Sequence, residues 1–355
     1  MTDAFLWLGL ELVERGLVPD SLVRRAIRGV CARRLREQAA AGPEAQAAFI
    51  ASFADSPIAL VPEKANEQHY EAPVELFERA LGHNLKYSCC YWDETTATLD
   101  EAEARALEIT CERADLQDGQ DVLELGCGWG SLTLWMAARH PQSRILAVSN
   151  SRLQREFIVG RARRRGLDNV EVITADMNEF STDRRFDRIV SVEMFEHMRN
   201  YPRLFERVSS WMRPDAKLFV HVFCHREYTY PYETEGAGNW LGRHFFSGGI
   251  MPSASLLTKV SSPLESTQQW EWDGTHYEKT ANAWLENLDA ARATLMPVFE
   301  RAYGRADAAR WFRRWRVFFM ACAELWGYKG GREWLVSHYL FEPQKAGAGR
   351  KGEAA

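Results

Sequence analysis

Side chains that can exchange protons gather in two short stretches of the sequence. The first holds Glu193, Glu196 and His197, and the second holds His221 and His225. A lone histidine is more often structural, but two carboxylates and three histidines at neighbouring strand ends favour acid–base chemistry, because perturbed titrating groups cluster in such crevices. Glu196 beside His197 is therefore a candidate acid–base pair.

A glycine-rich turn lies earlier in the chain, at Gly126-x-Gly128-x-Gly130, directly after the apolar run Val122–Leu125. A helical pattern follows it, so the glycines occupy a strand-to-helix corner. Glycine there lets the backbone approach a ligand, and the new helix offers unpaired N–H groups. With Glu124 just before it, this corner predicts a nucleotide-like cofactor site rather than a structural turn.

The spacing of this corner separates two kinds of nucleotide ligand. A dinucleotide site needs G-x-G-x-x-G and an acidic residue at the end of the second strand. This chain has G-x-G-x-G, and its second predicted strand ends in Ser149-Asn150-Ser151. The corner resembles instead the E/D-x-G-x-G-x-G motif of S-adenosylmethionine-dependent methyltransferases. An acidic, aromatic-lined pocket suits a cationic sulfonium ligand.

On this interpretation, neutral hydrogen bonds from Ser149, Asn150, Ser151 and Gln154 hold the ribose and the amino-acid end of the cofactor. The lack of an acid after the second strand departs from the commonest methyltransferase pattern, which puts the ribose contact in doubt. Asp176-Met177, after the third strand, fits the adenine position. The predicted cofactor-binding residues of this half of the site are Glu124, Gly126, Gly128, Gly130, Ser149, Asn150, Gln154, Asp176 and Met177.

Five apolar segments alternate with helical patterns from about residue 100 onward, and we predict them to be strands. They are Val122–Leu125, Ile145–Val148, Val170–Ile173, Phe186–Val192 and Leu218–Phe223. Parallel strands joined by crossover helices predict an α/β fold with a doubly wound sheet, whose ligands bind at the carboxyl ends of the strands. The proton-exchanging stretches follow such strand ends.

The flanking regions differ in pattern. Residues 1–80 predict an N-terminal helical region, with a linker at Ala39–Pro43, and residues 81–345 predict the α/β domain. Within that domain, the aromatic- and glycine-rich stretch 224–280 predicts a substrate lid, and helices return over 281–340. Residues 346–355 predict a disordered tail.

The segment from Ser21 to Gln38 has apolar residues at helical spacing and six arginines on its other face. Such a helix could lie on an anionic membrane surface. The commoner outcome is a solvated charged face over an internal apolar stripe. Peripheral membrane contact through this helix stays open as a partner prediction, and so does a homodimer. The arginines are Arg24, Arg25, Arg28, Arg33, Arg34 and Arg36.

Composition argues against several classes of protein. A formal net charge of −5 argues against a nucleic-acid partner. The seven cysteines show no repeated metal-ligand spacing, so we predict free thiols and no metal site. No apolar run approaches the roughly 18 residues of a membrane span, and the N-terminus lacks a signal-peptide pattern. We therefore expect a cytoplasmic protein.

Several separated motifs together are similar to one family. Over nearly its whole length the chain resembles the cyclopropane-fatty-acid synthase superfamily of S-adenosylmethionine-dependent methyltransferases, and within it the coclaurine N-methyltransferase-like branch. The resemblance implies a Rossmann-like class I methyltransferase sheet and S-adenosylmethionine as cofactor. The motifs that carry it are Gly16–Asp20, Lys64–Tyr70, Tyr87–Trp92, Glu124–Gly130, Glu193–Met198, Phe245–Ser253 and Trp334–His338.

The resemblance also implies roles for individual residues. Tyr87 and Ser88 would help to close over the cofactor. In the amine-methylating branch, the counterparts of Glu193, Glu196 and His197 line the amine pocket. Either Glu196 or His197 would then take or hold the proton of the amine, which must be neutral to attack the methyl group.

The lipid-modifying members of the family imply a different use of the same region. A bicarbonate ion acts there as the base, held by counterparts of Cys89, Glu196, His221 and Tyr277 and by a backbone group at Phe223, a position that is usually isoleucine. This chain carries both sets of residues. The motifs alone therefore leave the two chemistries open.

We predict an enzyme that transfers a methyl group to a small amine or related nucleophile, because the Phe245–Ser253 block and the long N-terminal segment favour that branch. The alternatives are modification of unsaturated acyl lipids, with bicarbonate as base, and a non-catalytic protein that binds S-adenosylmethionine or lipid. Several aromatic side chains could stabilise a carbocation, cradle a flat amine or simply pack a lid. These are Tyr230, Trp240, Phe245, Phe246 and Trp272.

Overall fold

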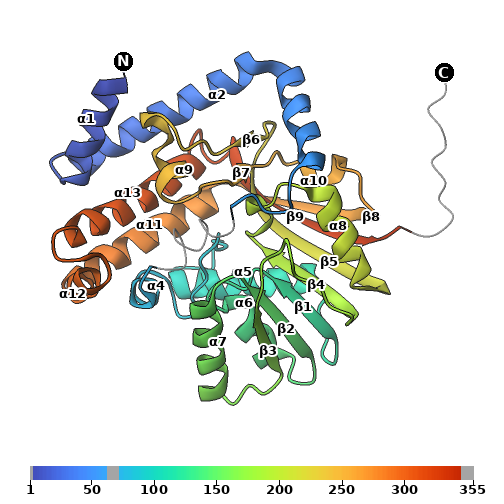
Figure 1. Ribbon diagram of the computed structural model, residues 1–355. Helices are drawn as coiled ribbons and strands as arrows, with labels where there is room; N and C mark the ends of the chain where they lie inside the picture. The colour runs from blue at the N-terminus through green and yellow to red at the C-terminus, as the bar shows by residue number, and fades with distance from the viewer. Residues whose placement is uncertain (1–2, 62–71, 345–355) are drawn as a thin grey trace.

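A seven-stranded mixed sheet forms the centre of the computed structural model, which describes residues 3–61 and 72–344 (Figure 1). The strand order is β3-β2-β1-β4-β5-β9-β8. The motif at residues 64–70 and the predicted tail at 346–355 lie outside the described residues. The strands are β1 (Asp121–Leu125), β2 (Arg144–Ser149), β3 (Val170–Thr174), β4 (Phe186–Val192), β5 (Met212–His225), β8 (Leu264–Trp272) and β9 (Trp334–Pro343).

The first five strands run parallel and confirm the five predicted ones. Only β5 is much longer than predicted, because it begins at Met212 rather than Leu218. Residues Leu218–His225 of β5 pair with β9, which runs antiparallel between β5 and β8.

Strands β8 and β9 were not predicted. Every residue of β9 from Trp334 to Phe341 is buried, so it lacks the alternation that distinguishes a strand from a buried helix. β8 is polar and partly exposed, and it falls within the stretch 224–280 that predicted a lid. This part of the stretch belongs to the central sheet, and the lid role of the remainder stays a prediction, as does the domain boundary at residue 80.

Helices cover both faces of the sheet. α5 and α6 pack on one face through Leu107, Trp135 and Met136. α8 and the 3-10 helix η1 pack on the opposite face, where Phe53 and Tyr201 are fully buried. The sheet is therefore doubly wound, as predicted. The bounds of these helices and of α7 are η1 (Ser52–Asp55), α5 (Leu99–Arg113), α6 (Ser131–Arg139), α7 (Arg152–Arg164) and α8 (Tyr201–Ser210).

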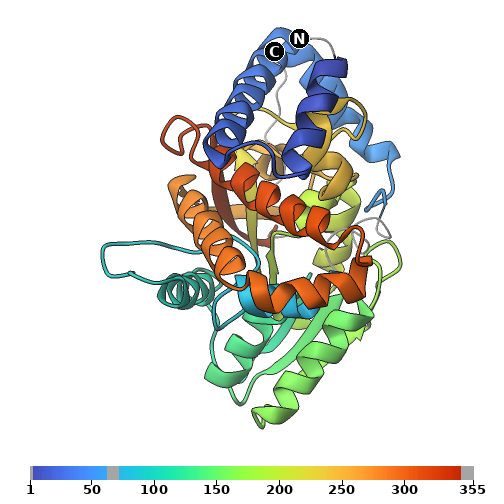
Figure 2. The ribbon, with the colours of Figure 1, turned by 90° about the vertical axis from the view of Figure 1, so that its left-hand side faces the viewer.

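A second group of helices lies beside the carboxyl ends of the strands. Figure 2 shows α13 beneath α2, with α11 and α12 next to it, and α13 contacts all three. Their apolar faces share one aromatic-rich core with α4 and α9. The helices are α1 (Asp3–Glu14), α2 (Asp20–Ala51), α4 (Val74–Ala80), α9 (Trp240–His244), α11 (Thr275–Ala290), α12 (Arg292–Tyr303) and α13 (Ala308–Trp326).

Short elements connect β5 to β8. Strands β6 and β7 pair antiparallel, and α9 lies between them in the sequence. The remaining short elements are η3 (Phe195–His197), β6 (Tyr230–Pro231), η4 (Ala237–Asn239), β7 (Ile250–Met251) and α10 (Leu256–Lys259). No helix in the described ranges is both long and apolar enough to cross a membrane.

The predicted linker at Ala39–Pro43 is wrong, because the chain there is helical and belongs to α2. Gly42 alone leaves helical geometry, with φ 74° and ψ 176°. Pro43 follows at the first position of the resumed helix, where its missing N–H leaves no hydrogen bond unmade. The glycine–proline pair therefore kinks a helix rather than separating two domains.

The arginine face of α2 turns partly toward the protein. Arg24 donates to Glu324 of α13 at 2.9 Å and to Asn282 of α11 at 2.8 Å. Arg28 also pairs with Glu324, and Arg34 donates to Asn239 at 3.0 Å. These contacts dock α2 on the helical layer.

The glycine corner joins β1 to α6 as predicted. Gly126 and Gly130 both have φ of 81°, and a Cβ on either would stand 2.6 to 2.7 Å from a neighbouring side chain. Glu124 is fully buried and accepts a hydrogen bond from Thr133 of α6 at 2.5 Å. The carboxyl group thereby fastens the strand to the first turns of the helix.

Replacing Glu324 with glutamine should loosen α2. Glu324 is only 11% exposed and holds two arginines, so the change weakens two charge-assisted contacts and should cost about 1 kcal/mol of local stability. We expect limited proteolysis within α2 to become several-fold faster. Glu37→Gln is the matched control, because Glu37 contacts only arginines of α2 itself in the described ion pairs. Equal cleavage of both variants would contradict this docking.

Replacing Glu124 with glutamine should change how stability depends on pH. Burial raises the pKa of Glu124 from 4.5 to about 7. The folded protein therefore keeps a proton that the unfolded chain loses, and this stabilisation disappears as the pH rises through that window. Glutamine has no such proton. We expect the free energy of unfolding of Glu124→Gln, relative to the parent, to be larger at pH 8 than at pH 5 in denaturant titrations of ligand-free protein. A pH-independent difference would refute this.

Candidate active site

Two adjoining cavities lie along the carboxyl ends of the central strands. The first has a volume of about 670 Å³ and follows the ends of β1, β2, β3 and β4. The second has a volume of about 680 Å³ and lies between the ends of β4 and β5 and helices α11 and α13. His197 lines both, so it stands where the two cavities meet.

Polar groups from several strand ends line the first cavity. A Cβ on Gly128 would meet no atom within 4 Å, so the backbone there faces open space. The Ser149 hydroxyl donates to Gln154 Oε1 at 2.7 Å. Gln154 Nε2 is buried without a hydrogen-bond partner and so offers a donor to a ligand. The predicted cofactor residues that line this cavity are Gly126, Gly128, Ser149, Asn150, Gln154, Asp176 and Met177.

Four other predicted cofactor residues do not line the first cavity. Glu124 faces Thr133, and Gly130 packs against Ile158 of α7. Tyr87 lines the second cavity, and Ser88 accepts a hydrogen bond from Lys86. Their contact with a cofactor stays a prediction.

Aromatic side chains form most of the wall of the second cavity. Of the five aromatic residues singled out in the sequence, only Phe246 lines it. Phe245, for example, stacks on Phe318 in the helical core at 4.4 Å between ring centres. Four further wall residues were not predicted. Three of them lie on buried helices, where aromatic residues look alike whether they face a core or a cavity. These four are Tyr232, Trp284, Phe318 and Trp326.

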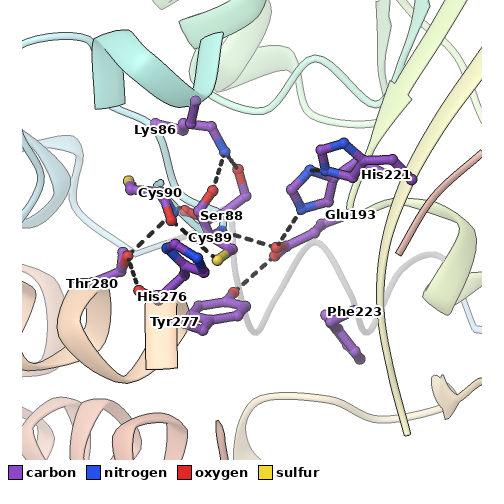
Figure 3. Close-up of polar contacts among 12 residues, drawn as sticks. Lys86, Ser88, Cys89, Cys90, Glu193, His221, Phe223, His276, Tyr277 and Thr280 are labelled. Carbon is purple, nitrogen blue, oxygen red and sulfur yellow. Dashed lines mark hydrogen bonds and ion pairs between the residues drawn. The ribbon is translucent and has the colours of Figure 1, made fainter. Parts of the chain in front are cut away.

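Glu193 is the centre of the hydrogen bonds at the second cavity (Figure 3). Its Oε1 accepts from the backbone N–H of Cys89 at 2.9 Å and lies 3.2 Å from His221 Nε2. Its Oε2 accepts from the Tyr277 hydroxyl at 2.8 Å. The structure thus joins the turn before α5, the end of β5 and the start of α11 around one carboxylate.

Backbone strain marks the same residue. Glu193 has φ of 48°, in the left-handed region that favours glycine. Such a conformation costs about 1–3 kcal/mol and clusters at functional sites. The strained turn directs a charged side chain from the end of β4 into the cavity wall.

The carboxyl groups of Glu193 and Glu196 differ in proton affinity. Burial raises the pKa of Glu193, but Lys86 and the donors from Cys89 and Tyr277 act in the opposite direction. The pKa of Glu196 is raised well above its usual range by burial and by the negative charge of Glu193. We therefore assign the ionised form to Glu193 and the protonated form to Glu196, since two neighbouring carboxylates do not both ionise readily.

The Glu196 carboxyl group makes its hydrogen bond with Phe223 rather than with His197, and the predicted acid–base role of these two residues stays a prediction. Glu196 Oε1 accepts from the backbone N–H of Phe223 at 2.6 Å, and its Oε2 is buried without a hydrogen-bond partner. His197 lies against the ring of Phe246 at 4.4 Å between centres. Burial lowers the pKa of His197 to about 4, so the imidazole is neutral at pH 7.

Lys86 and Cys89 show what the motif around Tyr87 contributes. Lys86 is buried and donates to the Ser88 hydroxyl and to the Cys89 carbonyl, each at 2.6 Å. The pKa of the Cys89 thiol is raised well above its usual range by burial, so the thiol is neutral and only its backbone N–H reaches Glu193. Sequence reasoning missed Lys86, although it stands next to the recognised motif.

Known proteins are similar to this chain over most of its length. Residues 61–330 match the family model of mycolic acid cyclopropane synthetase. The chain is 39% identical to (S)-coclaurine N-methyltransferase of Thalictrum flavum subsp. glaucum over 94% of each protein. It is 29% identical to cyclopropane-fatty-acyl-phospholipid synthase of Escherichia coli (strain K12), over 71% of this chain and 66% of that protein.

A solved structure agrees with these sequence relationships. Coclaurine N-methyltransferase bound to N-methylheliamine and SAH is 39% identical and superposes with a TM-score of 0.90, covering 96% of this chain and 99% of that one. These relatives are enzymes, so the alternative of a non-catalytic binding protein is not supported. The predicted family and fold are confirmed: the chain belongs to the mycolic acid cyclopropane synthetase family and is an S-adenosylmethionine-dependent methyltransferase.

Proposed function

We propose that this enzyme transfers the methyl group to the nitrogen of a small amine that carries an aromatic ring system and binds in the second cavity. The observation that carries the proposal is the Glu193 carboxylate in a mostly aromatic wall. Carboxylates and aromatic faces both attract an ammonium group. The relatives named as N-methyltransferases, one of them bound to N-methylheliamine, support an acceptor of this class.

The first cavity fits S-adenosylmethionine. Gly128 leaves room for a ligand against the backbone, and Gln154 Nε2 is a buried donor without a partner. Ser149, Asn150 and Asp176 supply further polar groups on the same wall. When bound, the cofactor supplies an electrophilic methyl group on a positively charged sulfur.

We assign two roles to Glu193, both of which concern the acceptor. The Glu193 carboxylate draws the ammonium form of the acceptor into the cavity and takes the proton that the nitrogen must lose before it can attack. Because burial raises the pKa of Glu193, this carboxylate is a stronger base than an exposed one. Neutral His197, at the junction of the cavities, orients the nitrogen toward the first cavity.

The residues do not fit a bicarbonate ion, which the lipid-modifying alternative requires. Three of the donors expected to hold it are already used, because the Cys89 backbone, His221 and Tyr277 all contact the Glu193 carboxylate. The fourth, the backbone N–H of Phe223, is taken by Glu196. A carboxylate of the protein thus occupies the hydrogen-bonding position of the ion. We therefore favour the amine over the acyl lipid.

The partner and location proposals follow from weaker observations. We propose a cytoplasmic enzyme whose α2 acts within the molecule, because Arg24, Arg28 and Arg34 contact other parts of the chain. Peripheral membrane contact and a homodimer stay predictions that vesicle flotation and sedimentation can test.

A direct assay tests the acceptor class. Purified enzyme with methyl-labelled S-adenosylmethionine should label small aromatic amines and leave unsaturated phospholipid vesicles unlabelled. Added bicarbonate should not change the rate. Bicarbonate-dependent labelling of lipid would overturn the proposal.

Replacing Gly128 with alanine should separate cofactor binding from folding. The added methyl group would stand in the first cavity without meeting a protein atom within 4 Å, and φ of 50° adds a cost of about 1 kcal/mol. We expect calorimetric affinity for S-adenosylmethionine to fall at least tenfold while the protein stays folded. Gly130→Ala is the contrast, because its Cβ would lie 2.6 Å from Ile158 and should lower stability. Unchanged affinity in Gly128→Ala would place the cofactor elsewhere.

Replacing Glu193 with glutamine should remove most activity. Glutamine cannot take a proton, and its amide group would face donors, so we expect kcat/KM for the amine to fall by about 100-fold or more. Glu196→Gln is the matched comparison, since Glu196 is already neutral and glutamine keeps an acceptor for Phe223. We expect a loss below about tenfold there. If Glu196→Gln proves far more damaging than Glu193→Gln, the two assignments are reversed.

A further inference from the structure

Three side chains behind Glu193 form a continuous hydrogen-bonded row that ends at α5. His221 Nδ1 lies 2.9 Å from His338 Nε2, and His338 Nδ1 lies 2.7 Å from Arg113 Nη1. With the 3.2 Å contact between His221 Nε2 and Glu193 Oε1, the row runs from Arg113 to the cavity. Both histidines are fully buried.

The chemistry of the first member fixes the direction of the row. Arginine has only N–H donors, so His338 Nδ1 must accept from Arg113. The proton of neutral His338 then lies on Nε2, which donates to His221 Nδ1. His221 in turn carries its own proton on Nε2 and donates it to Glu193 Oε1. Each tautomer follows from the preceding one.

The histidines must be neutral for this order to hold. A charged imidazole has two donors, and two facing N–H groups would repel each other. Burial lowers the pKa of His221 and of His338 well below the usual range, and the positive charge of Arg113 acts in the same direction. Both rings are therefore neutral at pH 7.

The fold holds each member of the row in place. His221 and His338 are direct cross-strand partners of β5 and β9. The Arg113 guanidinium lies over the rings of Trp270 and Trp272, 5.0 and 5.6 Å from their centres. The Trp272 ring also packs on His338, with 4.3 Å between ring centres. This packing positions the guanidinium toward His338.

We propose that Arg113 and His338 are positioning residues that fix the tautomer of His221, so that it always presents an N–H to Glu193 and holds this carboxylate ionised and oriented for the acceptor. The proposal rests on the proposed role of Glu193 toward an amine. Neither residue touches the second cavity. Their effect reaches the acceptor only through His221.

The ionisation of Glu193 also depends on its other neighbours. These come from the turn before α5, from η3, from β5, from α11 and from α13. Tests must therefore change Arg113 or His338 and leave these groups intact. The titratable groups that face Glu193 are Lys86, Cys89, Cys90, Glu196, His197, His221, Tyr277 and Cys322.

The tautomers can be observed without any substrate. Nitrogen-15 NMR of histidine-labelled enzyme should show His221 and His338 as neutral rings protonated on Nε2 at pH 7. Arg113→Met keeps an apolar stem on the two tryptophans but removes the donor, so the Nε2–H signature of His338 should weaken. An Nδ1–H tautomer at His221 in the unchanged protein would overturn the proposal, whatever the substrate is.

Kinetics test the consequence for Glu193. Loss of a charge-assisted hydrogen bond should lower kcat by about tenfold in Arg113→Met and in His338→Met. Because Glu193 then loses a donor to its ionised form, the acid limb of kcat/KM should move up by about one pH unit. His338→Gln should restore much of the rate and return the limb toward its original pH, since its amide can accept from Arg113 and donate to His221.

Controls separate this role from general damage to the core. His225→Gln changes another buried histidine of β5, whose Nδ1 accepts from the backbone of Glu227 and Tyr228 rather than from this row. It should leave the acid limb in place. An unshifted limb in folded Arg113→Met and His338→Met would refute the positioning role. If the unchanged enzyme methylates no amine, the proposed function fails. The NMR experiment would still show whether His221 and His338 have the expected tautomers.

Discussion

A carboxylate removed from water costs several kcal/mol unless donors surround it, and Glu193 meets donors from several separate elements. The Cys89 turn, strand β5 and helix α11 each supply one. The strained turn after β4 holds the side chain where these donors converge. Sheet, helical layer and N-terminal turn must therefore assemble in one arrangement for this group to be stable.

Under the proposed function, the two cavities have different electrostatic tasks in bringing two positively charged reactants together. A sulfonium cofactor and an ammonium acceptor repel each other, so a negative group must stand near both. The cofactor cavity is lined largely by neutral amides, hydroxyls and backbone, whereas the acceptor cavity contains the ionised Glu193. Because Glu196 is protonated, only one of the two neighbouring carboxyl groups carries a negative charge. This limits the free-energy cost of burying them.

Patterns among neighbouring residues predicted the elements whose structure depends mainly on neighbouring residues. Strands β1 to β4 and the glycine corner were recognisable because short apolar segments alternate with helical patterns there, and because the glycines are spaced closely in the sequence. Strand β9 was missed because a strand buried on both faces has no alternation.

The candidate site was predicted as a set of residues but not as an arrangement. The resemblance assigned Glu193 to an amine pocket and His221 and Tyr277 to a bicarbonate site, and it did not predict that these side chains contact one another. These contacts depend on side-chain directions set by tertiary packing. Lys86 and Arg113 carried no local signal, since a lysine beside a motif and an arginine at a helix end are ordinary on most surfaces. His338 lies in a recognised motif, but the motif implied no role for it.

The late position of β9 in the sequence determines when the hydrogen bonds behind Glu193 can form during synthesis. This strand lies between β5 and β8 in the sheet but follows both in the sequence, so it can enter the sheet only after residues 334–343 have left the ribosome. Until then β5 exposes an unpaired edge, which is prone to pairing with other chains. His221 also lacks its partner on that strand. A nascent chain that ends before residue 334 can thus build the glycine corner, but it cannot complete the row behind Glu193.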